Sequence, residues 1–378
     1  MNKVQPTIVI LTISDLYYEA NLHRKVKTLL ERGFKIRLFC TYHPDLNKNL
    51  WAGIELVQIR LWPGPTFVRF LQFWFKTTFL IFSQKADLFI AYDFLPLLPL
   101  RIKSIFQHCS YIYDSVELVM GLNSLVNRPV RRWFFKTLER FGIGRAKAAF
   151  TVCQSDARAL QKAYPNLNVV GFVRNIPVRQ KHERSDFLRR KYSIAPDKTI
   201  GIYQGMVFEG RGLKEIIKAC QPLKEVALVI VGDGPLLPTL KELVQTLDMS
   251  DRVIFTGLVP FEKLPDFTYS ADFGFTIISG QGLSYRHALP NKLFEYIQAQ
   301  IPVIGSNYPE IRKIIEQEQI GFVVNPQNIA EITEAVRKIL QKDIYRNLKR
   351  NLQQAAPKYT WQEESKKYLQ IIEQWLKE

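Results

Sequence analysis

Short apolar runs alternate along this chain with longer stretches in which apolar residues recur every three or four positions. In the first half the runs cover residues 8–13, 35–40, 54–59, 88–91, 111–113 and 149–152, and in the second half residues 199–204, 227–231 and 320–324. Buried parallel strands are near-continuous apolar runs, and the helices that connect them are amphipathic. The alternation therefore predicts an α/β protein with parallel sheets.

The chain has 378 residues, a length that favours two domains over a single hydrophobic core. We expect an N-terminal α/β domain at residues 1–175, a polar and basic linker at 176–186, and a C-terminal α/β domain at 187–358. A last amphipathic helix is predicted at 359–378.

Charge separates the two halves. The formal net charge is +17, and about 24 of the 52 basic residues but only about 11 of the 35 acidic ones lie in the first 175 positions. A basic surface is typical of proteins that bind nucleic acid or anionic membranes, although an inert solvated face is the alternative. No recognisable nucleic-acid-binding module is present, so nucleic acid is not an expected partner.

The four cysteines, Cys40, Cys109, Cys153 and Cys220, lie far apart, and none has a cysteine or histidine partner at metal-binding spacing. This distribution indicates reduced thiols in the core of a cytoplasmic protein.

Two stretches of the first half are unusual. Residues 67–82 are apolar nearly all round but too short and too charged to span a bilayer, so we expect core packing there, with membrane contact as the alternative. In residues 128–147, four basic residues follow i, i+4 spacing beside an apolar stripe, which favours a helix in a membrane interface over a core helix with a solvated edge. The candidate membrane and acceptor contacts are Arg128, Arg131, Arg132, Trp133 and Lys136.

The most informative stretch is residues 289–307, LPNKLFEYIQAQIPVIGSN. Pro290 and Asn291 open an amphipathic helix whose free N–H groups form an anion site, and Lys292 adds a positive charge. Glu295, one turn later, can bind a hydroxyl beside that anion. A diphosphate with an attached ribose would suit this arrangement. An ordinary αβ unit with a solvated lysine is the alternative.

This stretch closely resembles the nucleotide-sugar signature of the retaining glycosyltransferases of family 4 (group 1), which have the GT-B fold, and in particular the branch that reads PNK-x-FEY. The resemblance extends from about Ile8 to Trp361. It implies two Rossmann-like domains with parallel sheets facing across a cleft, the first on the acceptor side and the second binding the nucleotide sugar. It also implies that the C-terminal helix returns to the first domain.

The resemblance assigns roles to individual positions. Asp114 and Glu117 match the family's Tyr-Asp-x-His-Glu segment, and together with Arg211 and Lys292 they are the expected catalytic residues. Asp93 is a further acid after the strand at 88–91. The expected donor-binding residues are Gly205, Arg211, Gly232, Gly234, Gly257, Leu258, Gly282, Pro290, Asn291, Lys292 and Glu295.

Three polar residues of the family pattern are replaced, by Val116, Met206 and His287. The resemblance nevertheless implies a retaining glycosyltransferase that moves a sugar from a UDP- or GDP-sugar to a lipid-linked or glycolipid acceptor. We expect it to be metal-independent, because no DxD motif or histidine cluster occurs, and to sit peripherally on the inner face of the membrane. A nucleotide-sugar-binding partner subunit without catalysis is the alternative that the three replacements motivate.

Overall fold

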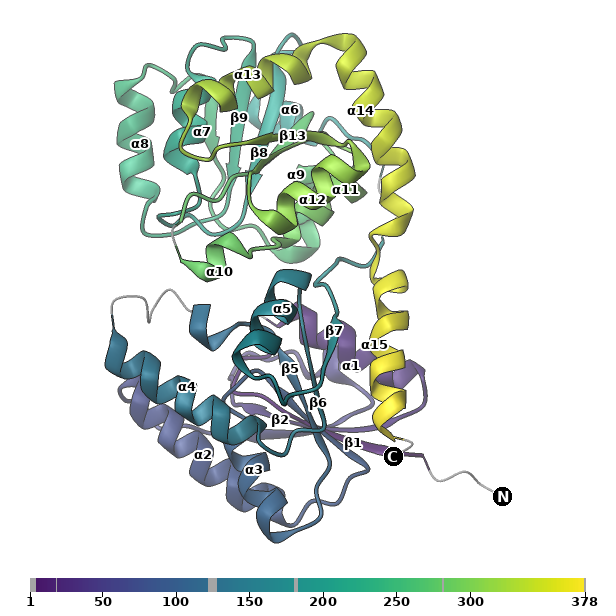
Figure 1. Cartoon of the computed structure of the whole chain (residues 1–378). Coiled ribbons are helices and arrows are strands. Elements are labelled where there is room, and N and C mark those ends of the chain that lie inside the picture. The colour runs from purple at the N-terminus through teal and green to yellow at the C-terminus, as the bar shows by residue number, and fades with distance from the viewer. Residues whose placement is uncertain (1–4, 18, 122–127, 180–182, 281, 377–378) are drawn as a thin grey trace. The chain divides into compact units, whose positions relative to one another are not determined.

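The computed structural model describes residues 5–17, 19–121, 128–179, 183–280 and 282–376 (Figure 1). The chain divides into two compact units, Met1–Asn175 with Glu364–Glu378, and Ile176–Glu363. The predicted linker at 176–186 begins the second unit, and its residues 180–182 lie outside the described part.

The first unit is built on a seven-stranded parallel sheet in the order β3-β2-β1-β4-β5-β6-β7. The six strands predicted from apolar runs are present, which confirms the parallel α/β architecture. A seventh, β7, was not predicted, because it is a short edge strand with no fully buried residue. The strands are β1 (Thr7–Leu11), β2 (Lys35–Thr41), β3 (Glu55–Ile59), β4 (Leu88–Tyr92), β5 (Tyr111–Ser115), β6 (Ala148–Thr151) and β7 (Val169–Phe172).

Helices cover both faces of this sheet (Figure 1). One face packs against α2 (Thr66–Phe82), α3 (Leu97–Phe106), α4 (Pro129–Ile143) and α5 (Gln154–Ala163), which share one apolar core with alternate strand residues. The other face carries α1 (Ala20–Glu31) and most of α15 (Trp361–Leu376), where Tyr368 packs on Phe150 of β6. Two short 3-10 turns, η1 (Lys48–Trp51) and η2 (Val119–Gly121), complete the unit.

The predicted core packing of residues 67–82 holds for one face of α2 only. Phe73, Trp74 and Ile81 are buried against the sheet, and the indole of Trp74 donates to the carbonyl of Leu95 at 3.0 Å. The opposite face of the helix is open to solvent. A helix that is apolar all round does not specify which of its sides faces the core. Only the structure could therefore distinguish the buried face of α2 from the exposed one.

The second unit has a six-stranded parallel sheet in the order β10-β9-β8-β11-β12-β13. The strands are β8 (Thr199–Gln204), β9 (Val226–Val231), β10 (Val253–Phe255), β11 (Phe273–Thr276), β12 (Val303–Ser306) and β13 (Gly321–Val324). In both units the strand order reverses between the first strand and a later one, β1 and β4 in the first unit and β8 and β11 in the second.

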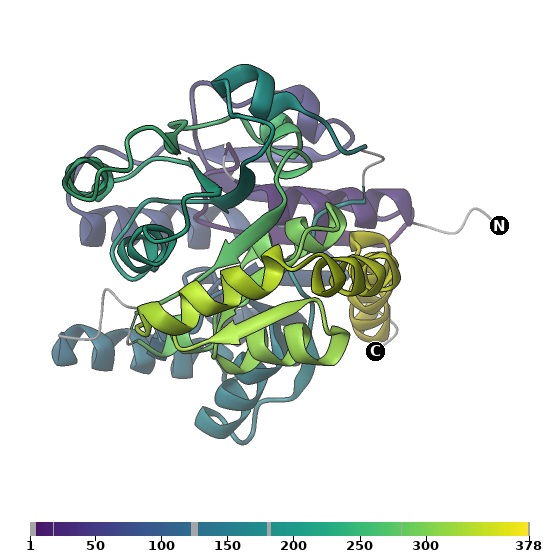
Figure 2. The same ribbon diagram turned by 90° about the horizontal axis from the view of Figure 1, so that it is seen from above.

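Helices again cover both faces of this sheet, as the two views show (Figure 1, Figure 2). One core joins alternate strand residues to α6 (Phe187–Tyr192), α9 (Leu264–Thr268), α11 (Asn291–Gln298), α12 (Pro309–Glu318) and α14 (Lys342–Ala355). The other joins the remaining strand residues to α7 (Leu213–Cys220), α8 (Leu237–Thr246) and α13 (Ile329–Leu340). Shorter elements are α10 (Leu283–Arg286), η4 (Phe261–Lys263) and η5 (Ala356–Lys358).

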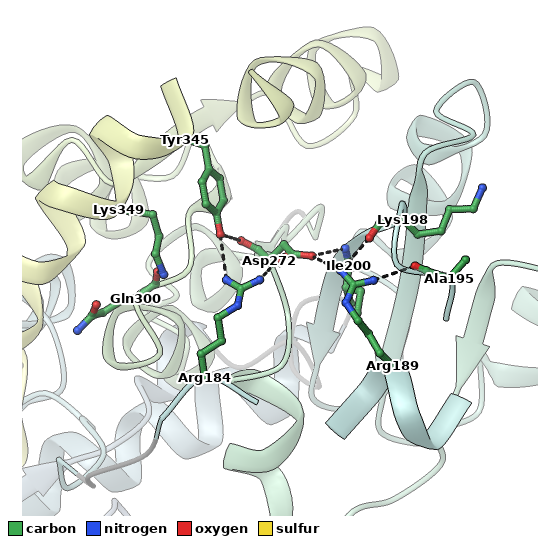
Figure 3. A network of polar contacts seen from close by, with 9 residues as sticks. All are labelled: Arg184, Arg189, Ala195, Lys198, Ile200, Asp272, Gln300, Tyr345 and Lys349. Carbon is green, nitrogen blue, oxygen red and sulfur yellow. Dashed lines mark hydrogen bonds and ion pairs between the residues drawn. The ribbon is translucent and has the colours of Figure 1, made fainter. Parts of the chain in front are cut away.

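A polar network ties the start of the second unit to its sheet (Figure 3). The carboxylate of Asp272, just before β11, accepts hydrogen bonds from the guanidinium groups of Arg184 and Arg189 and from the N–H of Ile200. The hydroxyl of Tyr345 donates to the carbonyl of Asp272 at 3.3 Å. The end of the predicted linker and helix α6 after it are therefore held by ionic contacts as well as by apolar packing.

None of the helices in the described part of the chain is both long enough and apolar enough to cross a membrane.

Candidate functional site

The candidate site of the second unit lies where the strand order reverses, at the carboxyl ends of β8 and its neighbours. Open parallel sheets bind ligands at this kind of position, because the connections leave the sheet there in opposite directions. The predicted donor residues lie on the loops after β8, β9, β10 and β11 and on α11. Their clustering therefore follows from the topology.

Glycines allow three of these loops to approach one another. Gly205 and Gly232 have φ angles of 130° and 133°, which L side chains rarely adopt. A Cβ on Gly232 would lie 2.0 Å from the carbonyl oxygen of Gly205, and the N–H of Gly232 donates to the carbonyl of Gly257 at 3.0 Å. Gly234 is constrained in the same way, since a Cβ added at this position would lie 2.3 Å from the carbonyl oxygen of Val207. A side chain at Gly232 or Gly234 would force the loops apart.

Lys292, in the first turn of α11, lies against this glycine cluster. Its side chain is only 7% exposed, and its Nζ lies 3.5 Å from the centre of the Tyr203 ring. A Cβ built on Gly205 would be 3.6 Å from the same nitrogen. Among the residues that the structure describes, this Nζ has no hydrogen-bond partner.

The environment of Lys292 disfavours its charge. Burial, and then the positive charge of Arg211, hold the pKa of the amine well below its usual value, while Glu295 acts in the opposite direction. A buried amine without an acceptor is unfavourable unless something pairs with it. An anionic ligand at the carboxyl ends of the strands would supply the missing acceptor.

Glu295 lies one helical turn after Lys292 and is held by a residue that sequence reasoning missed. The side-chain amide of Gln204, the last residue of β8, donates to the Glu295 carboxylate and accepts from the hydroxyl of Thr268 at 2.8 Å. The signal in the sequence was a polar residue ending an apolar strand. This chain of contacts orients a carboxylate that can accept a ligand hydroxyl.

Arg211 lies on the loop after β8, with its guanidinium carbon 5.6 Å from the centre of the Tyr285 ring. The neighbouring Gly210 accepts from the N–H of Ser279 at 2.9 Å, and a Cβ on Gly280 would lie 2.2 Å from the Tyr285 ring. The loops after β8 and β11 are therefore packed together, which places Arg211 and Lys292 close enough to influence each other's charge.

The remaining predicted donor residues occupy the edges of the site. Pro290 is the N-cap of α11, one position earlier than the first-turn placement that the sequence suggested, and Asn291 is its exposed first residue. Gly282 is the N-cap of α10. Leu258 follows Gly257 with its side chain 80% exposed.

A cavity of about 880 Å³ lies at the carboxyl ends of β11, β12 and β13. It would accommodate a polar group of sugar size beside the strand-order reversal. Its lining residues are Ser279, Gly280, Leu283, Arg286, His287, Asn307, Tyr308, Pro309, Asn325, Pro326 and Gln327. His287 is thus part of a cavity wall.

In the first unit, Asp114, one of the predicted catalytic residues, lies in a buried ion pair with Lys25. Its side chain is 1% exposed, and both carboxylate oxygens accept from Nζ of Lys25, at 2.9 and 2.7 Å. The aromatic rings of Tyr92, Phe150 and Tyr368 surround that amine. A carboxylate enclosed in this way is not accessible to a substrate.

Asp93 and Glu117 are the more accessible acids of this region. Asp93 follows β4, where the first sheet reverses its strand order, and has a left-handed φ of 73°. Its carboxylate accepts from the N–H of Phe94 at 2.8 Å. Burial, and then the charge of Glu117, raise the pKa of Asp93 to about 8. Glu117 itself lies on the exposed turn after β5.

The candidate membrane residues lie on α4 and at its N-cap, Arg128, and all are exposed. Trp133 is 68% exposed. The inner side of the same helix is fixed by the buried Glu139, which accepts from the hydroxyls of Tyr113 and Tyr164 at 3.0 and 2.6 Å.

Comparisons with known proteins find relatives in sequence and in fold. Residues 184–359 match the family model of the glycosyl transferases group 1. The GDP-mannose-dependent alpha-(1-6)-phosphatidylinositol monomannoside mannosyltransferase of Mycobacterium tuberculosis is 28% identical over 159 residues, 40% of this chain and 41% of that protein. The alpha-monoglucosyldiacylglycerol synthase of Streptococcus pneumoniae is 31% identical over 147 residues, 37% of this chain and 32% of that protein. The matched segment thus spans less than half the length of either relative.

Among solved structures, Anabaena Alr3699/HepE in complex with UDP and glucose superimposes with a TM-score of 0.78 at 14% identity, over 98% of this chain and 100% of that one. This likeness shows the fold, which is that of the GT-B glycosyltransferases, and confirms the predicted fold class.

Proposed function

We propose that this chain, whose second domain matches the group 1 glycosyltransferases, transfers a sugar from a nucleoside-diphosphate sugar to a lipid-linked or glycolipid acceptor. The observation that carries the proposal is the buried amine of Lys292, which lies without a hydrogen-bond partner in the described part of the chain, beside glycine loops at the strand-order reversal. A donor diphosphate would supply the acceptor that this amine lacks.

The roles of the site residues follow from their chemistry. Arg211 and Lys292 would stabilise the negative charge of the departing diphosphate, an electrostatic contribution that needs no metal ion. Glu295, oriented by Gln204, would bind the ribose hydroxyls. The cavity beside Gly280 and His287 would hold the donor sugar. Transfer with retention of configuration on one face of the sugar requires no protein nucleophile, which suits this set of residues.

The identity of the donor and acceptor rests on the relatives. One relative is named for its dependence on GDP-mannose, and a structural neighbour holds UDP and glucose, so both UDP- and GDP-sugars are candidate donors. Both relatives are named for glycolipid synthesis. The exposed basic residues of α4 would hold the first unit against an anionic membrane surface, as expected of a peripheral enzyme on its cytoplasmic side.

A second function is motivated by Val116, Met206 and His287, which replace polar residues of the family pattern. In this alternative the chain binds a nucleotide sugar as a partner subunit and does not catalyse transfer. It predicts nucleotide binding that Glu295→Ala weakens, with no transfer to any acceptor.

The test is to incubate the purified chain with radiolabelled UDP-sugars and GDP-sugars and a membrane lipid extract. We expect label in the lipid phase with one donor, its loss in Glu295→Ala, and its retention in the control Glu334→Ala, whose carboxylate lies on the exposed face of α13. Nucleotide binding without lipid label would support the partner-subunit alternative. A chain that binds neither nucleotide would refute the donor site.

A further inference from the structure

The outer face of α2 is an apolar ridge, formed by Phe67, Val68, Leu71, Phe75 and Phe79. Phe67, Leu71, Phe75 and Phe79 are spaced four residues apart, so their side chains line one side of the helix. Phe75 and Phe79 are each 78% exposed. A contiguous exposed row of large apolar side chains marks an interaction surface, whereas single exposed ones need no explanation.

The ridge cannot turn inward, because the opposite side of α2 is fixed in the core. Phe73, Thr77 and Ile81 are fully buried, and the indole of Trp74 donates to the backbone of the segment before α3. Rotating the helix would expose these residues instead. The ridge is therefore a permanent feature of the folded first unit.

Helix α2 lies in the same layer of the first unit as the basic helix α4 (Figure 1). Phe67 contacts Phe134 of α4 with ring centroids 6.1 Å apart, and Phe70 contacts Phe135 at 6.0 Å. The surface beside the ridge carries the exposed side chains of Arg132, Trp133 and Lys136, among others. Ring contacts thus join the two helices, and the α2 ridge together with the exposed side chains of α4 is here called the α2–α4 face.

The α2–α4 face presents no negative charge from its helices. The sequence of α2 contains no acid, and the one acid of α4, Glu139, is buried and bonded to two tyrosine hydroxyls. Apolar side chains that enter the acyl boundary, flanked by cations that meet headgroup phosphates, are the signature of an interfacial helix.

We propose that the α2–α4 face is a docking surface for a bilayer containing anionic lipids, with the α2 ridge as the inserted element and α4 as its electrostatic anchor. This deepens the proposed function, in which membrane contact rested on α4 alone. A second copy of the chain fits the face less well, because a two-fold interface would bring the arginines of α4 close to one another. Insertion by α2 would also fix which side of the first unit meets the lipid.

The experiment measures binding of the full-length chain to vesicles of phosphatidylcholine with about one-third phosphatidylglycerol, by flotation. We expect Phe75→Ser with Phe79→Ser to weaken binding about tenfold or more, because both rings leave water on insertion. The control Leu50→Ser removes an exposed apolar side chain elsewhere in the same unit and should bind normally. Because the ridge rings are exposed, circular dichroism of the double variant should be unchanged.

A second arm separates insertion from charge. Arg132→Gln with Lys136→Gln should reduce binding to anionic vesicles and make it less dependent on salt, and vesicles of phosphatidylcholine alone should bind the unaltered chain weakly. Equal vesicle binding by the Phe75/Phe79 variant and the unaltered chain would overturn the proposal. A chain that forms dimers by sedimentation, loses them in that variant and ignores vesicles would also overturn it in favour of a second copy. Binding of UDP or GDP, measured on the same samples, reports on the proposed function separately.

Discussion

Replacing Lys292 with methionine should separate stability from function in the second unit. The amine is buried over the Tyr203 ring, without a hydrogen-bond partner in the residues described, and Arg211 lies near enough to disfavour its charge. Methionine is unbranched and of similar length, so it fills the same space without the amine. The variant should therefore fold better and bind the donor worse than the unaltered chain.

The magnitudes follow from the contacts. An unsatisfied buried polar group costs about 1–3 kcal/mol, and the contact with the Tyr203 ring offsets about 0.5–1 kcal/mol of this. Lys292→Met should thus raise the free energy of unfolding by about 1 kcal/mol. Loss of a charge-assisted hydrogen bond of about 1.5–3 kcal/mol to the diphosphate should weaken nucleotide binding about 10- to 100-fold.

The pH dependence has a definite sign. Because the pKa of Lys292 is lowered in the folded state, the unfolded chain binds more protons between that lowered pKa and the ordinary 10.5. Stability therefore rises with pH across this window, and Lys292→Met should lack this contribution to the rise. A bound diphosphate would favour the charged amine, so nucleotide binding should be accompanied by proton uptake in the unaltered chain.

Urea unfolding at several pH values measures the free energy of unfolding and its pH dependence. Isothermal titration with UDP and GDP measures nucleotide affinity, and repeating it in buffers of different ionisation enthalpy measures proton uptake. Lys241→Met, a substitution on the exposed surface of α8, is the matched control and should change neither the free energy of unfolding nor the nucleotide affinity. The reasoning is refuted if Lys292→Met lowers the unfolding free energy by more than about 1 kcal/mol while nucleotide affinity stays unchanged.

Three further substitutions test the framework around the sites. Lys25→Met leaves the carboxylate of Asp114 buried and unpaired, so it should lower the free energy of unfolding by about 3–5 kcal/mol in urea titrations, and adding Asp114→Leu should recover most of this loss. Equal stability of the single and double variants would contradict the structural role of the pair. Asp93→Asn keeps a side chain that tolerates the left-handed φ of 73°. Because the folded-state pKa of Asp93 is raised from 3.8 to about 8, its contribution to stability falls as pH rises through that window, and the variant should lose less stability between pH 5 and 8; identical pH profiles would rule this out. Asp272→Asn weakens contacts with two arginines, one of them the half-exposed Arg184. It should therefore lower the melting temperature of the second unit, which calorimetry measures. An unchanged melting temperature would mean that apolar packing alone holds the end of the linker and α6.

The sequence by itself determined most of the fold and the centre of the candidate site. Apolar runs located nine of the strands to within a few residues, since a buried parallel strand needs a continuous apolar segment wherever it lies in the chain. The stretch around Lys292 and Glu295 was predicted to be a helix start after a loop, and α11 begins at Asn291. These features depend on residues close together in the sequence, which is why local patterns could find them.

Only the tertiary structure decided which side chains are buried and with what. Asp114 is paired with Lys25, 89 positions away, and no local pattern reveals that partner. Lys292 could have been a solvated lysine and is instead enclosed by Tyr203 and the glycine loops, which arrive from other strands. The outer face of α2 carries Phe75 and Phe79 in a helix that is apolar all round, so its exposed side was set by where α3 and α4 pack. Burial is a property of neighbours brought together by the fold, and for that reason local patterns in the sequence could not show which of these side chains are enclosed and which are exposed.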